Sequence, residues 1–229
     1  MICRQTPRIK LICSLSKKYE TVADVGCDHA YTAINLAQMG KKVIASDISE
    51  GPLKKAEINI ERFGLKDKID LRLCSGLMGY KENEVDEIII AGMGGNVISE
   101  IIDKSIKIAK SAEMLILQPM TSPEVLRRFL YENDFKIEKE HLVCEDRRIY
   151  TIMQVIPEKM QKFSEIDCFL SRYIIENKNK KIYGDYIRCR KSEFEKIISG
   201  LRKTDKKKEK LKYYENLLAD ITKIEKGDF

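Results

Sequence analysis

The first 156 residues alternate short apolar runs with segments of helical periodicity, and this alternation restricts the possible fold more than any other feature. Runs typical of β-strands cover 21–26, 42–47, 69–76, 85–95 and 112–119, and helical spacing covers 30–40, 51–65, 96–110 and 122–134. Strands joined by single helices run parallel, because each helix returns the chain to the same end of the sheet. The pattern therefore predicts an α/β fold with a doubly wound, mostly parallel sheet.

Two further runs, 136–146 and 148–156, alternate apolar and polar residues with a period of two. This period is typical of strands, and we expect the runs to form a closing antiparallel pair. Together with the five earlier runs they would complete a seven-stranded sheet. A helix around 5–20 is expected before the first strand.

The chain changes character after Pro157, where no further strand-like run occurs. Apolar residues follow helical spacing in three groups: Ile166, Phe169, Tyr173 and Ile174; Phe194, Ile197, Ile198 and Leu201; and Leu211, Tyr214, Leu218 and Ile221. We predict a domain boundary between 1–156 and 157–229, with two or three long helices forming a hairpin or coiled coil in the second part. Gly184 and the charged stretch 200–210 could mark turns, or 200–210 could be a charged helix. A dimerisation device is an equally good interpretation of the same spacing.

The net charge of +6 lies entirely in this last third. Residues 1–156 contain 23 basic and 23 acidic side chains, whereas residues 157–229 contain 19 basic and 13 acidic side chains. Such an asymmetry favours an anionic partner for the second part, and nucleic acid is the first candidate. A solvated helical surface would account for the same charges.

Seven scattered cysteines without a C-x-x-C pair indicate neither a disulfide framework nor a zinc site. We expect most of them to be small buried residues in a reducing cytosol, and we expect no metal ion. No run approaches 18 apolar residues, and the N-terminus has no uninterrupted apolar segment, so neither a membrane span nor a signal peptide is predicted.

The stretch "TVADVGCDHAY", residues 21–31, places a turn directly after the first strand. Ligands of open parallel sheets bind beyond the carboxyl ends of the strands, so this turn is a candidate site. The dinucleotide fingerprint G-x-G-x-x-G is absent, and the carboxylate of Asp28 would repel a pyrophosphate. NAD and FAD are therefore disfavoured.

S-adenosylmethionine (SAM) carries a positive sulfonium and a positive ammonium group, so carboxylates near the turn would attract it. Asp24 and Asp28 fit this role, and Gly26 would let the cofactor approach the backbone. Asp47 ends the second strand about 20 residues after Gly26, where an acidic residue holds the ribose hydroxyls in related sheets. Ser75 and Gly76, after the third strand, could cover the adenine.

The fourth strand ends in "AGMGG", which comprises Ala91, Gly92, Met93, Gly94 and Gly95. Three glycines would leave a floor with few side chains, on which a flat acceptor could lie beside the methyl group. Each residue also has a structural interpretation. Asp47 could cap the next helix, "AGMGG" could allow close backbone packing, Cys27 could be a packed thiol, and His29 could be a hydrogen-bonding residue at a helix start.

These motifs resemble the bacterial tRNA adenine-N1 methyltransferases that modify adenine 22. The resemblance rests on "ADVGCDHAY" (23–31), "ASDI" (45–48), "GPLKKAEINI" (51–60), "AGMGG" (91–95) and "LQPM" (117–120), and it covers residues 4–156. Cys27 stands where the family often has serine. The resemblance implies a Rossmann-like class I methyltransferase fold followed by a coiled-coil-like helical domain. It also implies SAM as cofactor and tRNA as substrate.

By this resemblance, the SAM pocket would be lined by Asp24, Gly26, Cys27, Asp28, His29, Asp47, Ile48, Ser75, Gly76, Ala91, Gly92 and Met93. Tyr31, Asn59, Met93 and Gly94 would lie near the acceptor, and Asp28, His29 and Tyr31 are the candidate catalytic residues. Arg188, Arg190, Lys191, Arg202 and Lys203 of the second part would hold tRNA phosphates. We expect a cytoplasmic monomer or weak homodimer.

The chemistry needs no strong base, because N1 of neutral adenine already has a lone pair. His29 or Asp28 could accept a hydrogen bond from N6, and Tyr31 could stack on an adenine that has left its helix, or simply pack beneath the loop. Three alternatives remain open: a SAM enzyme acting on a small molecule or protein, a non-catalytic RNA-binding module, and a NAD-dependent oxidoreductase.

Overall fold

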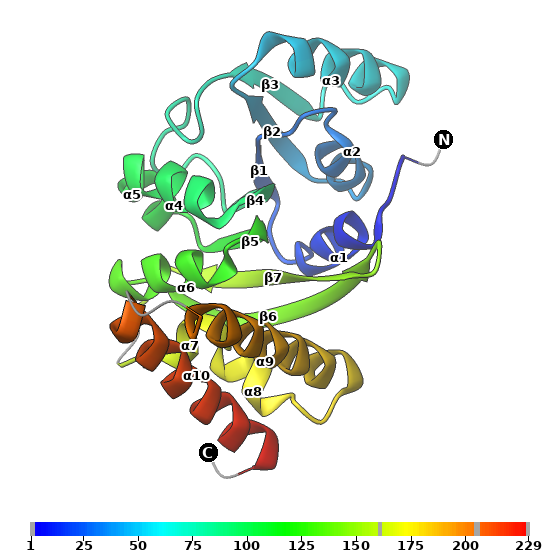
Figure 1. The fold of residues 1–229 in the computed structure, drawn as a ribbon. Helices are drawn as coiled ribbons and strands as arrows, with labels where there is room; N and C mark the ends of the chain where they lie inside the picture. The colour runs from blue at the N-terminus through cyan, green and yellow to red at the C-terminus, as the bar shows by residue number, and fades with distance from the viewer. Residues whose placement is uncertain (1–2, 160–161, 204–206, 228–229) are drawn as a thin grey trace. The chain divides into compact units, whose positions relative to one another are not determined.

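The computed structural model describes residues 3–159, 162–203 and 207–227, and the chain divides into two compact units, Met1–Met160 and Gln161–Phe229 (Figure 1). The strands of the first unit are β1 (Thr21–Val25), β2 (Lys42–Asp47), β3 (Ile69–Leu73), β4 (Glu87–Gly94), β5 (Met114–Thr121), β6 (Lys136–Glu145) and β7 (Arg148–Ile156). Its helices are α1 (Pro7–Leu15), α2 (Tyr31–Gln38), α3 (Glu50–Arg62), α4 (Gly95–Lys104), α5 (Ile106–Ser111) and α6 (Pro123–Glu132).

The seven strands form one sheet in the order β3-β2-β1-β4-β5-β7-β6. Neighbouring strands from β3 to β5 run parallel, whereas β7 is antiparallel to both β5 and β6. The sheet is therefore mixed, with a parallel majority and a closing antiparallel pair. The predicted fold class and the closing antiparallel pair are confirmed.

Helices cover both faces of this sheet (Figure 1). One hydrophobic cluster joins α1, α2 and α3 to the sheet through residues such as Ile12, Ile34 and Ile60. The other joins α4 and α6 to the opposite face, through Ile98 and Leu126 among others. Strand β4 is buried on both faces, since Ile88 and Ile90 pack in the second cluster and Ile89 between them packs in the first. This burial explains its continuous apolar run.

The order of the strands reverses between β1 and β4. From β1 the chain winds outward through β2 to β3, and it then crosses to β4 and winds in the other direction. Such a reversal opens a crevice beyond the carboxyl ends of the two central strands. The loops after β1, β2 and β4 thus share one end of the sheet, as the sequence predicted.

One expected helix, 96–110, is wrong in detail, because the structure divides it into α4 and α5 at Ser105. Ser105 has φ −137° and ψ 41°, which is not helical, and its N–H donates to the carbonyl of Ile102 at 3.1 Å. The break lets Ile102 and Ala109 both pack in the same cluster against the sheet. Tertiary packing has here overridden a continuous helical pattern.

The second unit contains two long helices, α9 (Lys181–Leu201) and α10 (Lys208–Lys226), and two short ones, α7 (Glu165–Phe169) and α8 (Arg172–Glu176). Lys191 pairs with Glu225 at 2.6 Å and Arg202 with Glu215 at 2.8 Å, so α9 and α10 lie side by side in opposite directions. This is a helical hairpin. Part of the charged stretch 200–210, residues 204–206, lies outside the described residues.

The sequence left open that Gly184 marks a turn between helices. In the structure it lies inside α9 instead. A Cβ atom there would lie 3.0 Å from the carbonyl oxygen of Lys178, so glycine permits the close approach of the preceding segment. Such an approach offsets the roughly 1 kcal/mol that glycine costs within a helix. In the described part of the chain, no helix is long and apolar enough to cross a membrane.

Candidate functional site

The loop after β1 has an unusual backbone. Gly26, Asp28 and Ala30 have φ values of +75°, +47° and +59°. The N–H groups of Gly26 and Cys27 both donate to the carbonyl of Ser46, each at 2.8 Å, and so fix the loop to the end of β2. Left-handed conformations cost non-glycine residues about 1 kcal/mol or more and concentrate at functional sites. The surrounding hydrogen bonds maintain this strained turn.

Asp47, the last residue of β2, connects two loops at this end of the sheet. One carboxylate oxygen accepts the N–H of Asp28 at 3.2 Å, and the other accepts the N–H of Ser49 at 3.0 Å. Helix α3 begins at Glu50 with Ser49 as its N-cap residue, so Asp47 binds outside the helix. Asp47 is therefore not the helix cap of the alternative interpretation.

A cavity of about 300 Å³, called the strand-end cavity below, lies at the carboxyl ends of β1 to β4. Six of the predicted cofactor-binding residues line it: Gly26, Asp47, Ile48, Ser75, Gly76 and Met93. They come from four different strand ends, far apart in sequence. Ile48 and Met78 at its wall are 69% and 68% exposed, which is unusual for large apolar side chains and indicates a surface available to a flat apolar group.

The structure places Asp24 behind the loop rather than in the wall of this cavity. Its side chain is 4% exposed and accepts the N–H of Ala33 at 3.1 Å, inside the first turns of α2. Burial raises the pKa of Asp24 to about 7, and the negative charge of Asp47 adds to the shift. Asp24 can thus act on a ligand only through the position of α2 and through its charge.

Cys27 is also a packed residue, as its structural interpretation predicted. Its side chain is 7% exposed and belongs to the hydrophobic cluster on the α1–α3 face. Burial and the neighbouring carboxylates raise the pKa of the thiol, so Cys27 is a poor nucleophile. Cys74, by contrast, lines the cavity.

The "AGMGG" segment bends at the end of β4. Its pairing with β5 is irregular on both sides of Met93, as in a β-bulge, and Gly92 has φ +81°. Gly92 is exposed, and nothing lies within 4 Å of where its Cβ atom would be. The expected bare floor is only partly observed, because the Met93 side chain lies so close over Gly26 that a Cβ atom there would overlap its methyl group.

His29, Tyr31 and Asn59 lie together beside the β1 loop. The ring centroids of His29 and Tyr31 are 5.7 Å apart, and Asn59 donates to the carbonyl of His29 at 3.0 Å. The imidazole Nε2 lies 3.6 Å from the carboxylate of Asp28. The guanidinium of Arg4, which the sequence analysis did not select, lies 5.8 Å from the centre of the Tyr31 ring. Tyr31 is half-buried and also packs against the core, so both of its interpretations remain.

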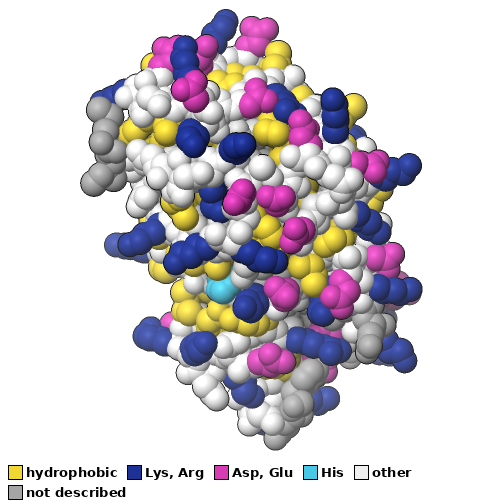
Figure 2. Space-filling view, turned by 180° about the vertical axis from the view of Figure 1, so that it is seen from behind, with side chains coloured by type: hydrophobic (Ala, Val, Ile, Leu, Met, Phe, Trp, Pro, Cys, Tyr) yellow, Lys and Arg dark blue, Asp and Glu magenta, His cyan; other side chains and the backbone are white. Residues whose placement is uncertain are grey.

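Most of the predicted phosphate-binding cations of the second unit already have acidic neighbours. Arg188 pairs with Asp185, Arg190 with Glu193 at 2.8 Å, Lys191 with Glu225, and Arg202 with Glu215. Arg188 and Arg202 remain well exposed, whereas Arg190 and Lys191 are largely covered. Figure 2 shows basic and acidic side chains interspersed over the visible face.

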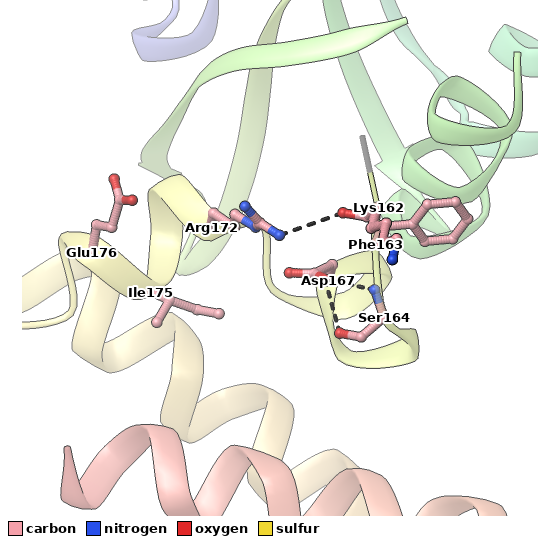
Figure 3. Close-up of a pocket in the computed structure, with 7 residues that line it drawn as sticks. All are labelled: Lys162, Phe163, Ser164, Asp167, Arg172, Ile175 and Glu176. Carbon is pink, nitrogen blue, oxygen red and sulfur yellow. Dashed lines mark hydrogen bonds between the residues drawn. The ribbon is translucent and has the colours of Figure 1, made fainter. Parts of the chain in front are cut away.

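A hollow of about 470 Å³ also lies within the second unit (Figure 3). Arg172 donates to the carbonyl of Lys162 at 3.4 Å, and Asp167 accepts the N–H and hydroxyl of Ser164 at 2.7 and 2.8 Å. The Ser164–Asp167 pair is a capping box that begins α7. The side chains of Asp167 and Arg172 in this hollow are therefore engaged in contacts that hold the local fold.

Sequence reasoning missed part of the cavity wall. Val97, Glu100, Ile101 and Lys104 of α4 line it together with Met78. Their spacing along one helix face was visible, but only the fold shows that this face turns toward the strand ends. Gln118, which lies in the noted "LQPM" segment, was also not selected, although its side chain accepts the N–H of Gly92 at 3.2 Å. Among the described residues, no cluster of three or more side chains suited to a metal ion occurs.

Residues 5–153 match the family model described as "Methyltransferase domain". The chain is 34% identical over 151 residues to the tRNA (adenine(22)-N(1))-methyltransferase of Bacillus subtilis (strain 168), an alignment that covers 61% of this chain and 63% of the relative. The chain thus spans somewhat less than two thirds of that relative's length.

Solved structures resemble the chain over nearly its whole length. Streptococcus pneumoniae Sp1610, a candidate tRNA (m1A22) methyltransferase in complex with S-adenosyl-L-methionine, has a TM-score of 0.84 and 30% identity, over 97% of this chain and all of that chain. TrmK of M. capricolum, in complex with S-adenosyl-homocysteine, has a TM-score of 0.77 and 26% identity, over 98% and 97% of the two chains.

The fold, the strand-end cavity and the family match together define a class I methyltransferase. Within this class, the chain belongs to the family of the tRNA (adenine-22-N1)-methyltransferases.

Proposed function

We propose that the protein is a SAM-dependent methyltransferase that methylates N1 of an adenine in tRNA, at position 22 by analogy with its relatives. The observation that carries this proposal is the carboxylate of Asp47 at the rim of the strand-end cavity, joined to the β1 loop through the N–H of Asp28. A carboxylate at this place suits ribose hydroxyls, and a loop without the dinucleotide glycines suits a ligand without a pyrophosphate.

Different residues around the cavity would contact different parts of the cofactor. Asp47 would accept the ribose hydroxyls, while Ile48 and Met78 would enclose the adenine ring between apolar surfaces. Ser75 and Gly76 would border the ring, and Gly26 would let the cofactor lie against the backbone. Asp24, Cys27, Asp28, His29, Ala91 and Gly92 complete the proposed set, with Asp24 and Cys27 acting from behind the loop.

SAM supplies, when bound, an electrophilic methyl carbon on a positively charged sulfur. The adenine N1 lone pair forms the new bond to that carbon, the carbon–sulfur bond breaks, and its electron pair stays on the sulfur. Positive charge moves from the sulfur to the adenine ring, and no proton is lost in this step. The protein must therefore align the two partners and tolerate the charge.

Several residues in and beside the β1 loop would suit this task. Asp28 has a well-exposed carboxylate, and it or His29 would accept a hydrogen bond from N6 of the adenine. The Tyr31 ring, flanked by His29 and Arg4, would stack on the base. Asn59 would hold the His29 backbone, while Met93 and Gly94 would border the acceptor.

The second unit would bind the tRNA backbone. Arg188, Arg202 and Lys203 are the best-suited members of the predicted set, because the first two are exposed and would exchange acidic partners for phosphates. Arg190 and Lys191 would contribute less. The domain division at residues 156 and 157, a cytoplasmic location, and a monomeric or weakly dimeric state are parts of the same proposal.

The test is an incubation of the protein with SAM and unmodified tRNA transcripts, followed by digestion and mass spectrometry of the nucleosides. The proposal predicts 1-methyladenosine, formed by the wild type and lost in Asp47→Ala. Binding of SAM without tRNA methylation would support an enzyme acting on a small molecule or protein. Binding of tRNA without SAM would indicate a non-catalytic RNA-binding module, and binding of NADH would indicate an oxidoreductase.

A further inference from the structure

Arg8 of helix α1 is held firmly at the side of the sheet. Its Nε and Nη2 donate to one carboxylate oxygen of Glu145 at 3.0 and 2.9 Å, and its backbone N–H donates to the other oxygen at 3.1 Å. The guanidinium lies 4.8 Å from the centre of the Tyr150 ring. Paired charge-assisted hydrogen bonds of this kind fix both position and orientation. Glu145 and Tyr150 belong to β6 and β7, so Arg8 is anchored to the closing hairpin.

The remaining guanidinium nitrogen, Nη1, points away from this anchor and reaches Gln118 of β5. It donates to the side-chain oxygen Oε1 at 3.1 Å and lies 2.7 Å from the sulfur of Met120. Gln118 is 1% exposed, and its Nε2 donates to the carbonyl of Pro119 at 2.8 Å. Because Nε2 has its own acceptor, the amide orientation is defined, and Oε1 faces Arg8.

The same Oε1 atom accepts the backbone N–H of Gly92 at 3.2 Å. Gly92 lies in the irregular end of β4, where its φ is +81° and the pairing with β5 is interrupted. A side chain thus takes the place that a strand neighbour holds elsewhere in the ladder. This hydrogen bond gives the Gly92 N–H an acceptor within the bulge and ties the bulge to the side chain of Gln118.

Met93 is the next residue after Gly92, so the conformation of the bulge sets the position of Met93 at the cavity. Its side chain lines the strand-end cavity and lies over Gly26. A continuous set of contacts therefore runs from the Arg8–Glu145 pair through Gln118 and Gly92 to Met93. Arg8 itself does not line the cavity.

We propose that Arg8 is a positioning residue for methyl transfer, which acts through Gln118 and the N–H of Gly92 on the Met93 wall between cofactor and acceptor. This inference rests on the proposed methyltransferase function and assigns a role in it to residues outside the predicted site. Arg8 touches neither reacting group, so its effect is on alignment. Alignment errors lower the rate of transfer more than the affinity for the cofactor.

The first experiment compares Arg8→Ala with Arg148→Ala in the full-length protein. Arg148 is an exposed cation in β7, in register with Glu145, so its removal changes the local charge without touching Gln118. We expect Arg8→Ala to lower the single-turnover rate of 1-methyladenosine formation at least tenfold, with the dissociation constant for SAM within threefold of the wild type. Arg148→Ala should keep both values within twofold. An equal rate in the two variants would overturn the proposal.

Two variants of Gln118 test the path itself. Gln118→Glu keeps an acceptor for both Gly92 and Arg8, whereas Gln118→Leu removes it. We expect the glutamate variant to stay within threefold of the wild-type rate and the leucine variant to lose at least tenfold. The double variant Arg8→Ala/Gln118→Leu should be no slower than Gln118→Leu alone, because both changes interrupt one path. Rate losses that multiply would contradict the path.

A measurement without tRNA separates this inference from the proposed function. With ¹³C-methyl methionine labelling, the Met93 methyl resonance is assigned by its loss in Met93→Leu. It should shift in Arg8→Ala and Gln118→Leu but not in Arg148→Ala. An unmoved resonance would overturn the proposal even if the wild type is active. If instead the wild type forms no 1-methyladenosine, the proposed function fails, whatever the resonance shows.

Discussion

The carboxylate of Asp47 accepts the backbone N–H of Asp28 at 3.2 Å, and so joins the end of β2 to the loop after β1. Helix α2 separates the two residues along the chain, but both lie at the carboxyl end of the parallel strands. Asp28 can adopt its φ of +47° in part because this hydrogen bond and those from Gly26 and Cys27 to Ser46 hold the loop. The carboxylate that is proposed to hold the cofactor ribose thus also shapes the loop beneath the cofactor.

Asp47→Ala should therefore weaken SAM binding by two routes, because the ribose loses an acceptor and the loop loses its tie. We expect an affinity loss of at least tenfold, about 1.5–3 kcal/mol, in isothermal titration calorimetry. Asp67→Ala is the matched control, since Asp67 is exposed and lies in the turn before β3, at the opposite end of that strand from the cavity. Unchanged affinity in Asp47→Ala would remove this residue from the site.

Gly26→Ala should abolish SAM binding through steric overlap. Its φ of +75° disfavours alanine, and the added Cβ atom would also overlap the Met93 methyl group. Gly40→Ala separates the two effects, because Gly40 has φ +92° with nothing within 4 Å. We expect Gly40→Ala to cost about 1 kcal/mol of stability without changing SAM affinity.

The double variant Gly26→Ala/Met93→Ala completes this comparison. It removes the overlapping methyl group and should recover part of the affinity that Gly26→Ala loses, measured in the same titration. If the double variant binds no better than Gly26→Ala, backbone strain alone accounts for the loss, and the packing of Met93 on Gly26 is unimportant for binding.

The raised pKa of Asp24 predicts a pH-dependent stability. Burial raises the pKa to about 7, whereas an unfolded aspartate titrates near 4. Between these values the folded protein holds a proton that the unfolded chain has released, so stability falls as pH rises through this window. Asp24→Asn keeps an acceptor for the Ala33 N–H but cannot ionise.

Urea unfolding at pH 5 and pH 8 measures this effect. Relative to the wild type, Asp24→Asn should gain about 1–3 kcal/mol of unfolding free energy on going from pH 5 to pH 8. Glu87, whose pKa burial raises to about 6, contributes equally in both proteins and cancels in the comparison. A constant difference between the two proteins would mean that Asp24 titrates near its ordinary pKa.

The proposed tRNA-binding role of the second unit predicts a change in salt dependence. Arg202→Ala/Lys203→Ala should lower tRNA affinity several-fold in low salt and reduce the slope of log affinity against log salt concentration by about 1–2. Lys17→Ala, which removes an exposed cation just before β1, is the control. An unchanged slope in the double variant would place the phosphate contacts elsewhere.

The sequence predicted which loops lie together, because a parallel topology brings the carboxyl ends of β1, β2 and β4 to the same end of the sheet. Asp47, Ile48, Ser75 and Gly76 reach the cavity for that reason. Side-chain direction was not predictable in the same way. Asp24 lies one residue before the end of β1, and only the packing of α2 shows that its carboxylate points inward to Ala33.

The α4 face and the Gln118 contact could not be predicted either, since both depend on tertiary contacts rather than on local pattern. Helical spacing shows that Val97 and Ile101 share a face, but not that this face meets the strand ends. Gln118 lies in an apolar strand. Its proposed role depends on two hydrogen bonds, one from Gly92 in the irregular end of β4 and one from Arg8, which is more than a hundred positions away in the sequence. The break at Ser105 has the same origin, in packing against the sheet.

A paired-transcript assay tests whether the protein transfers a methyl group to N1 of one particular adenine. Two unmodified tRNA transcripts that differ only in adenine or guanine at position 22 are incubated with the protein and SAM, and 1-methyladenosine is measured by mass spectrometry after digestion. We expect stoichiometric 1-methyladenosine in the adenine transcript and none in the guanine transcript. Equal amounts in both transcripts, or none in either, would contradict it.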